Sequence, residues 1–192
     1  MNILLHICCG PCAIYPLRAL REQGHEVTGL FYNPNIHPLQ EYLRRRGSAQ
    51  EVAGRFGLRM IFLDREYDPQ AYMRRVAFRE TSRCLLCYQL RLERTLSIAR
   101  RGKFQGFSST LLYSKQQQHQ VIARLGADLA GDGRVGFVYQ DFRLGWQEGI
   151  QQSLEWKLYR QDYCGCLYSE FERFQGSLQE VNEKRSPESQ TE

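Results

Sequence analysis

Strand-like and helix-like segments alternate over the first third of the chain, and this order limits the folds that the chain can adopt. Residues 2–7, 26–32 and 58–63 are short apolar runs with β-branched or bulky side chains, which are typical of buried strands. Residues 13–23 and 38–56 have helical patterns and lie between these runs. Strands that alternate with helices form a parallel sheet covered by helices. The sequence therefore predicts an α/β protein.

The rest of the chain extends this pattern. In chain order we predict a short helix at 67–76, a helix at 84–101, a strand at 104–112, a helix at 115–130, a strand at 135–139 and a helix at 147–159. A chain of 192 residues suits one domain with a substantial core. We expect this domain to cover residues 1–174 and the polar segment 175–192 to be a disordered tail.

The ends of the predicted strands carry the candidate binding residues, because ligands bind beyond the carboxyl ends of parallel strands. In strand order, these residues are Cys8 and Cys9, then Asn33, Asn35 and His37, then residues 108–110, and finally Asp141 and Arg143. We expect them to converge on one site. The candidate substrate contacts there are Asn33, Asn35, His37, Asp141 and Arg143. His6 lies within an apolar run and is interpreted as a core histidine.

Seven cysteines are clustered as C-C-x-x-C, C-x-x-C and C-x-C, which indicates metal or redox chemistry rather than scattered core positions. Cys84 and Cys87 share one face of a predicted helix, and Cys8 and Cys9 lie where Gly10 ends a strand. Four thiolates satisfy either a [4Fe–4S] cluster or a zinc ion. Adjacent cysteines fit a cluster with several metal vertices more easily than one small ion. We therefore favour the iron–sulfur cluster.

The other three cysteines allow several interpretations. Cys9-Gly-Pro-Cys12 has the spacing of a thioredoxin-like redox turn, and Cys12 is equally compatible with a second metal ion or with a spare thiol. A disulfide between Cys164 and Cys166 would close a very small ring, and strained disulfides are easily reduced. This pair is therefore a candidate redox relay, and two ordinary buried thiols are the alternative.

Basic residues outnumber acidic ones by 26 to 21, which favours an anionic partner such as nucleic acid. Either phosphate contact or a solvated surface would explain the basic positions at 44–46, Arg74, Arg75, Arg91, Arg94, Arg100, Arg101 and Lys103. The sequence contains neither a Walker A motif nor G-x-G-x-x-G, so it predicts no nucleotide phosphate loop.

The compartment is predicted from the N-terminal segment and from hydropathy. The sequence has no apolar stretch long enough to cross a membrane. Its first residues are predicted to be a strand rather than a signal peptide. We therefore expect a cytoplasmic protein without a membrane partner, in which structural disulfides would be unusual.

Six short motifs follow one another from His6 to about Ser169. They are H-I-C-C-G-P-C, F-Y-N-P-N-I-H-P followed by Glu41-Tyr42, R-C-L-L-C-Y, S-S-T-L-L-Y-S, Y-Q-D-F-R and Y-R-Q-D-Y-C-G-C. Each motif is modest alone, but their order and joint presence are specific. Together they resemble the QueH family of epoxyqueuosine reductases.

This resemblance implies the last step of queuosine synthesis, carried out on tRNA. The epoxide of epoxyqueuosine at the wobble position loses its oxygen and becomes an alkene, with two electrons and two protons consumed and water released. The fold implied is a single Rossmann-like domain akin to the PP-loop (HUP-like) proteins, with the iron–sulfur site at the carboxyl ends of the strands. The loop after the first strand carries Cys-Cys-Gly-Pro-Cys in place of the phosphate-binding sequence of PP-loop proteins.

The resemblance also assigns the cysteines. The implied ligands of a [4Fe–4S] cluster are Cys8, Cys9, Cys84 and Cys87. Cys164 and Cys166 match the redox-active pair, and the family is associated with an iron ion beside the cluster, for which Cys12 is a candidate ligand. The reaction requires an electron donor that the sequence does not identify. Two other functions fit the residues: an iron–sulfur or zinc-stabilised RNA-binding module, and a thiol–disulfide oxidoreductase.

Overall fold

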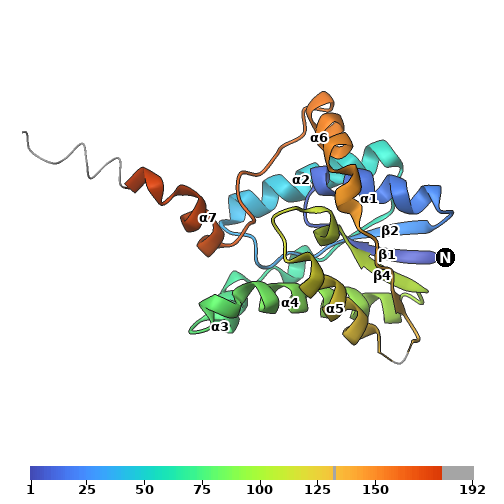
Figure 1. Cartoon of the computed structure of the whole chain (residues 1–192), viewed down its shortest axis with the longest axis horizontal. Coiled ribbons are helices and arrows are strands. Elements are labelled where there is room, and N and C mark those ends of the chain that lie inside the picture. The colour runs from blue at the N-terminus through green and yellow to red at the C-terminus, as the bar shows by residue number, and fades with distance from the viewer. Residues whose placement is uncertain (132, 179–192) are drawn as a thin grey trace, which may run out of the picture.

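Five parallel strands form the centre of the computed structural model, which describes residues 1–131 and 133–178 (Figure 1). The strands are β1 (Asn2–His6), β2 (Glu26–Phe31), β3 (Met60–Phe62), β4 (Gly106–Ser109) and β5 (Gly136–Phe137). Their order in the sheet is β3-β2-β1-β4-β5, and every neighbouring pair is parallel. The predicted α/β fold with a parallel sheet is confirmed.

Helices cover both faces of this sheet (Figure 1). One face is covered by α1 (Gly10–Glu22), α2 (Leu39–Phe56) and α6 (Trp146–Glu155), and the other by α4 (Arg83–Arg101) and α5 (His119–Ala130). The short helix α3 (Pro69–Val76) packs against α4. Because both faces are covered, the middle of the central strand β1 is apolar, and Ile3, Leu4 and Leu5 are fully buried. Within the described residues, no helix has the length and apolar character needed to span a membrane.

β1 lies at the point where the strand order reverses: β2 and β3 are added on one side of it, and β4 and β5 on the other. The connection through α1 leads from β1 to β2 on one side, whereas β4 pairs with the other side of β1. Such a switch point opens a crevice at the carboxyl ends of the two central strands. The residues that immediately follow β1 and β4 therefore lie at the natural binding position of this fold.

The fourth strand is shorter than predicted. β4 ends at Ser109, and a 3₁₀-helix, η3 (Thr110–Tyr113), replaces the remainder of the predicted strand at 104–112. The hydroxyl of Ser109 accepts a hydrogen bond from Leu111 N (3.2 Å), so the chain turns out of the sheet at this point. This turn brings Thr110 to the crevice beside the end of β1.

The chain continues as a helix after its last cysteine. α7 (Leu167–Phe174) was not predicted, although Leu167, Phe171 and Phe174 recur at helical spacing. It projects from the end of the molecule opposite the N-terminus (Figure 1). The segment predicted to be a disordered tail begins at residue 175. Residues 176–178 are still helical, and 179–192 lie outside the described residues.

Candidate metal and redox site

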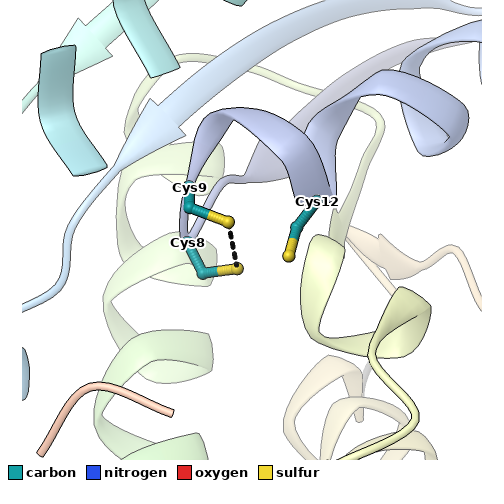
Figure 2. Close-up of side chains that lie close together, drawn as sticks. All are labelled: Cys8, Cys9 and Cys12. Atoms are coloured by element: carbon teal, nitrogen blue, oxygen red, sulfur yellow. Dashed lines mark hydrogen bonds between the residues drawn. The ribbon is translucent and has the colours of Figure 1, made fainter. Parts of the chain in front are cut away.

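Three cysteines meet in the crevice at the end of β1. Cys8 and Cys9 follow the strand, and Cys12 lies in the first turn of α1. Their Sγ atoms all lie within 4.8 Å of one another, and those of Cys8 and Cys9 are 3.9 Å apart (Figure 2). All three side chains are buried. The structure therefore places Cys12 next to the pair that was predicted to bind a metal.

The turn that carries these thiols depends on Gly10 and Thr110. A Cβ atom at Gly10 would lie 2.4 Å from the carbonyl oxygen of Ser48 in α2, so only glycine allows α1 to begin so close to α2. Cys8 N donates a hydrogen bond to Thr110 Oγ1 (3.1 Å), and the Thr110 hydroxyl donates to Cys8 Sγ (3.3 Å). α1 begins at Gly10, earlier than predicted, because Pro11 is tolerated in a first helical turn.

Six of the seven cysteines line one cavity of about 740 Å³. Its cysteines are Cys8, Cys12, Cys84, Cys87, Cys164 and Cys166. Cys84 and Cys87 lie in the first two turns of α4, with the spacing of a pair on one helical face. Cys9 does not line the cavity but contacts Cys8 through sulfur. The fold thus brings three cysteine motifs that are distant in sequence to a single space.

The C-x-C pair reaches the cavity from the loop between α6 and α7. Cys164 is exposed, and its Sγ accepts a hydrogen bond from Gln117 Nε2 (3.1 Å), whereas Cys166 is buried. Both are free thiols. Gly165 between them has a φ of 139°, a conformation that favours glycine. One thiol of the pair therefore faces solvent while the other lies in the interior.

A buried arginine of α2 holds this loop in place. Arg45 is 1% exposed and donates to Cys164 O (2.7 Å) and Tyr163 O (2.9 Å). Its Nε donates to the fully buried carboxylate of Glu41 (2.6 Å), which also pairs with Arg44 (2.9 Å). The Glu41–Arg45 ion pair therefore ties the C-x-C loop to α2.

A second buried arginine, Arg91 of α4, contacts the other side of the site. It is 2% exposed and donates to Cys87 Sγ (3.1 Å) and Cys87 O (3.3 Å). No carboxylate of the described residues pairs with it. Burial alone would lower the pKa of Arg91, but the negative charge available on Cys87, Cys164 and Cys8 raises it. A buried cation without a carboxylate partner requires other negative charge nearby.

These two positions correct the sequence interpretation of the basic residues. Arg45 and Arg91 face neither phosphate nor solvent, because both are buried against the cysteine motifs. Arg44 and Arg46 flank Arg45 on α2 and are partly exposed, and Arg46 pairs with Asp64 (2.8 Å). Helical spacing separates the three consecutive arginines onto different faces, which a count of basic residues does not reveal.

The three thiols at the end of β1 have different pKa values. Hydrogen bonds from Cys12 and Cys9 hold the pKa of Cys8 well below its usual value. Burial raises the pKa of Cys9 to about 12, and the hydrogen bonds to Cys8 and Cys9 raise the pKa of Cys12. Burial likewise raises the pKa of Cys87 to about 12.

The residues fit a thiolate-bound metal group. Metal binding displaces protons from thiols and adds positive charge, which removes the cost of burying several thiolates together. The cavity also offers two buried arginines to a group whose ligands are anionic. The sulfur donors suit iron–sulfur clusters or zinc, and the cavity is larger than one ion requires. Cys8, Cys9, Cys84 and Cys87 are thus available as soft ligands on two separate elements, with Cys12 beside them.

The candidate substrate residues that follow β2 have different surroundings. Asn33 is buried and donates from Nδ2 to Ile7 O (3.0 Å), so it links the ends of β1 and β2. Asn35 lines the cavity, and its buried Oδ1 has no hydrogen-bond partner in the described structure. Both ring nitrogens of His37 are buried without partners, its ring lies 5.3 Å from that of Tyr72, and burial lowers its pKa. Asn35 is therefore the best placed of these three to contact a ligand.

Asp141 and Arg143 do not line the cavity. They pair with each other (2.6 Å), and Asp141 also accepts a hydrogen bond from Arg143 N (3.1 Å) at the start of the 3₁₀-helix η4 (Phe142–Gly145). These hydrogen bonds from Arg143 lower the pKa of Asp141 to about 2. The expected convergence at the end of the fifth strand does not occur, because this pair is used as a local helix cap.

His6 is a core histidine, as predicted. It is fully buried, with Nδ1 2.9 Å from Ser109 Oγ and Nε2 3.1 Å from Tyr32 O. Burial and the nearby Arg91 charge lower its pKa to about 4, so the ring is neutral near pH 7. Its role is to bridge β1, β2 and β4 directly beneath the cysteine turn.

Gln161 is one of the site residues that the sequence interpretation missed. Gln161 donates from Nε2 to Cys9 Sγ (3.2 Å) and Cys12 Sγ (3.8 Å), while its Oε1 is buried without a partner. It lies in the loop after α6 and is separated by about 150 residues from the thiols that it contacts. No local pattern marks such a residue, although it belongs to the Y-R-Q-D-Y-C-G-C motif.

The fold and the site together define a class of protein: a Rossmann-like α/β domain with a thiol-lined cavity at the switch point of its sheet. A known structure of similar fold, a predicted tRNA methyltransferase subunit from Methanocaldococcus jannaschii, has a TM-score of 0.55 at 13% identity, covering 99% of this chain and 94% of the other. The family described as "Epoxyqueuosine reductase QueH" matches residues 3–172. The chain belongs to this family.

Two curated relatives illustrate the similarity. The epoxyqueuosine reductase QueH of Dehalococcoides mccartyi is 36% identical over 90% of this chain and 94% of its own length. That of Thermotoga maritima is 34% identical over 96% of this chain and 97% of its own length. The resemblance inferred from the six motifs is thereby confirmed, and it extends over nearly the whole chain.

Proposed function

We propose that this protein is an epoxyqueuosine reductase, an oxidoreductase that converts the epoxide of epoxyqueuosine at the tRNA wobble position into the alkene of queuosine. The observation that carries the proposal is the family match over residues 3–172, combined with six cysteines that line one cavity. The reaction is the last step of queuosine biosynthesis. Its substrate is a tRNA, so we place the protein in the cytoplasm.

Cys8, Cys9, Cys84 and Cys87 are the proposed ligands of a [4Fe–4S] cluster. When bound, such a cluster supplies electrons one at a time. The buried cations Arg45 and Arg91 offset the negative charge of the ligands, and Gln161 orients Cys9 through its hydrogen bond. We assign Cys12 to a further iron beside the cluster, because its sulfur lies within 4.8 Å of both Cys8 and Cys9.

Cys164 and Cys166 are the proposed source of reducing equivalents. Oxidation of the two thiols to a disulfide releases two electrons and two protons. Removal of the epoxide oxygen as water consumes two electrons and two protons and leaves a carbon–carbon double bond, so the two half-reactions balance. The exposed Cys164 is the thiol that an external reductant can reach, and the buried Cys166 lies beside the cavity.

The remaining cavity residues are suited to position the substrate. Asn35 lines this space and has a buried amide oxygen without a hydrogen-bond partner, so it is suited to accept a hydrogen bond from the modified base. Tyr72 and Tyr88 supply aromatic walls that suit an unstacked nucleoside. The excess of basic residues supports a polyanionic substrate.

The test is an anaerobic assay with tRNA that carries epoxyqueuosine and a chemical reductant, in which nucleosides are analysed by mass spectrometry. The proposal expects queuosine to form and iron and sulfide to be present in the active sample. RNA binding without deoxygenation would instead indicate an RNA-binding module. Catalysed disulfide exchange without iron, and without queuosine, would indicate a thiol–disulfide oxidoreductase.

A further inference from the structure

One aromatic side chain is exposed in an unusual backbone conformation. Phe78 is 99% exposed and has a φ of 59°, which lies in the left-handed region. A bulky non-glycine residue adopts this conformation only at a cost, and burial of the ring does not compensate here. Fully exposed phenylalanines contribute nothing to the core. The position therefore calls for a role outside folding.

The loop that presents Phe78 is held by hydrogen bonds at both ends. Phe78 N donates to the carboxylate of Glu80 (3.0 Å), and Arg79 N donates to Val76 O (2.9 Å) at the end of α3. Ser82 N donates to Arg79 O (2.9 Å) in the following 3₁₀-helix, η2 (Glu80–Ser82). These bonds stabilise the backbone around the left-handed residue. The ring is thus presented by an ordered turn.

The same loop borders the cysteine cavity. Arg83 Nη1 donates to Glu80 O (3.1 Å), and Arg83 itself lines the cavity, where it pairs with Glu172 of α7. Cys84 follows directly in the chain and lines the same cavity. Figure 1 shows that α3, which leads into this loop, lies at the end of the molecule opposite the N-terminus, as α7 does. The loop that carries Phe78 therefore leads directly into the cavity-lining residues Arg83 and Cys84.

The exposed neighbours of Phe78 in the chain are polar or charged, and they include two arginines and the Glu80 carboxylate that accepts from Phe78 N. Arg74 and Arg79 are exposed, and neither forms a salt bridge with another residue of the described chain. From residue 79 to residue 82 the exposed side chains are all polar or charged. An exposed ring with unpaired arginines close to it in the chain has the composition of a site for single-stranded nucleic acid, since bases stack on rings and phosphates pair with cations.

We propose that Phe78, with Arg74 and Arg79, forms a stacking platform for an unpaired base of the tRNA anticodon loop, next to the nucleotide that enters the cavity. This inference rests on the proposed function, because it deepens how the same substrate is recognised. An apolar protein surface is disfavoured as the partner, because it would offer no counterions to the exposed Arg74 and Arg79.

The experiment measures binding of a synthetic anticodon stem–loop RNA and of a fully paired RNA hairpin stem. Loss of one stacked base weakens binding by roughly 5- to 150-fold, so Phe78→Ala should raise the Kd for the stem–loop by about tenfold. The Kd for the paired stem should remain unchanged. Phe78→Trp should retain affinity, and its fluorescence should be quenched when the stem–loop binds. Leu144→Ala is the matched control, since Leu144 is 86% exposed and does not line the cavity.

Phe78→Asn provides a second, opposite readout. Asparagine tolerates the left-handed conformation better than phenylalanine does, so this variant should melt at a higher temperature while it binds the stem–loop more weakly. A merely structural phenylalanine would show the reverse change in melting temperature. An unchanged stem–loop Kd in both Phe78→Ala and Phe78→Asn would overturn the proposal.

Two further outcomes separate this inference from the proposed function. In one outcome, the wild type produces queuosine and Phe78→Ala has the same Kd and KM as the wild type. This result would reject the stacking platform and leave the enzyme assignment intact. A Phe78-dependent Kd without any queuosine formation would reject the enzyme assignment and retain the platform. Concentration-dependent dimerisation that Phe78→Ala abolishes, without any RNA effect, would show a protein interface instead and would also overturn the proposal.

Discussion

Replacement of Glu41 by alanine tests whether the buried ion pair holds the C-x-C loop. The Glu41 carboxylate is fully buried and accepts hydrogen bonds from Arg45 (2.6 Å), Arg44 (2.9 Å) and the hydroxyl of Tyr159. Its loss leaves the guanidinium of Arg45, whose side chain is 2% exposed, without a carboxylate partner. The loop contacts that Arg45 makes with Cys164 O should weaken as a result.

The magnitude follows from burial. Removal of one partner from a buried ion pair costs about 3–5 kcal/mol, because an uncompensated charge remains in the interior. In a domain of this size, each kcal/mol of lost stability lowers the melting temperature by roughly 2–4 °C. The melting temperature of Glu41→Ala should therefore be roughly 6–20 °C below that of the wild type. The same helix supplies a matched control in Glu51–Arg55, which has the same i,i+4 spacing and a distance of 2.9 Å but is more than 40% exposed. Glu51→Ala should cost less than about 0.5 kcal/mol.

Thermal unfolding followed by far-ultraviolet circular dichroism provides the assay, with both variants in the same metal-loaded state. A decrease for Glu41→Ala that is no larger than that for Glu51→Ala would refute the reasoning. A second variant distinguishes charge from packing: Glu41→Gln keeps the shape of the side chain but removes its charge, so it should retain only part of the stability.

The pH dependence of stability provides an independent check of the same carboxylate. Burial alone would raise the pKa of Glu41, but hydrogen bonds from Tyr159, Arg45 and Arg44 outweigh it, and the pKa is lowered. A carboxyl group with a lowered pKa in the folded state contributes stability above its unfolded pKa, near 4.5, and this contribution is lost as the pH falls through the folded value. The acid-induced loss of stability should therefore be smaller in Glu41→Gln than in the wild type.

Three further predictions concern the cysteines and the packing beside them. Cys84→Ser should lose cluster iron and activity together, and full iron and sulfide content after reconstitution would exclude Cys84 as a ligand. Cys164→Ser should keep its iron but fail to turn over more than once, and wild-type steady-state turnover would reject the relay. Gly145→Ala should destabilise the fold by about 1–3 kcal/mol, because its Cβ would lie 2.0 Å from the ring of Tyr15. Gly47→Ala, in the interior of α2 with no atom within 4 Å of its Cβ, should not destabilise it.

The sequence alone was sufficient for the order of the five strands and of the helices between them, though not for α7, and for the grouping of cysteines within each motif. Both are local properties. A continuous apolar run such as Ile3 to Leu5 indicates a strand buried on both faces, and C-x-x-C spacing places Cys84 and Cys87 on one side of a helix. The family resemblance rested on similar local information, namely short motifs in a specific order.

Only the tertiary structure decided which of these motifs meet and what surrounds them. Arg45 and Arg46 are neighbours in sequence, yet Arg45 contacts a carbonyl 119 positions away while Arg46 remains at the surface. Asp141 and Arg143 follow a strand like the other candidates, but they pair with each other and do not reach the cavity. The physical reason is that burial and contact between distant segments depend on how helices pack on the sheet, and no local spacing determines that arrangement.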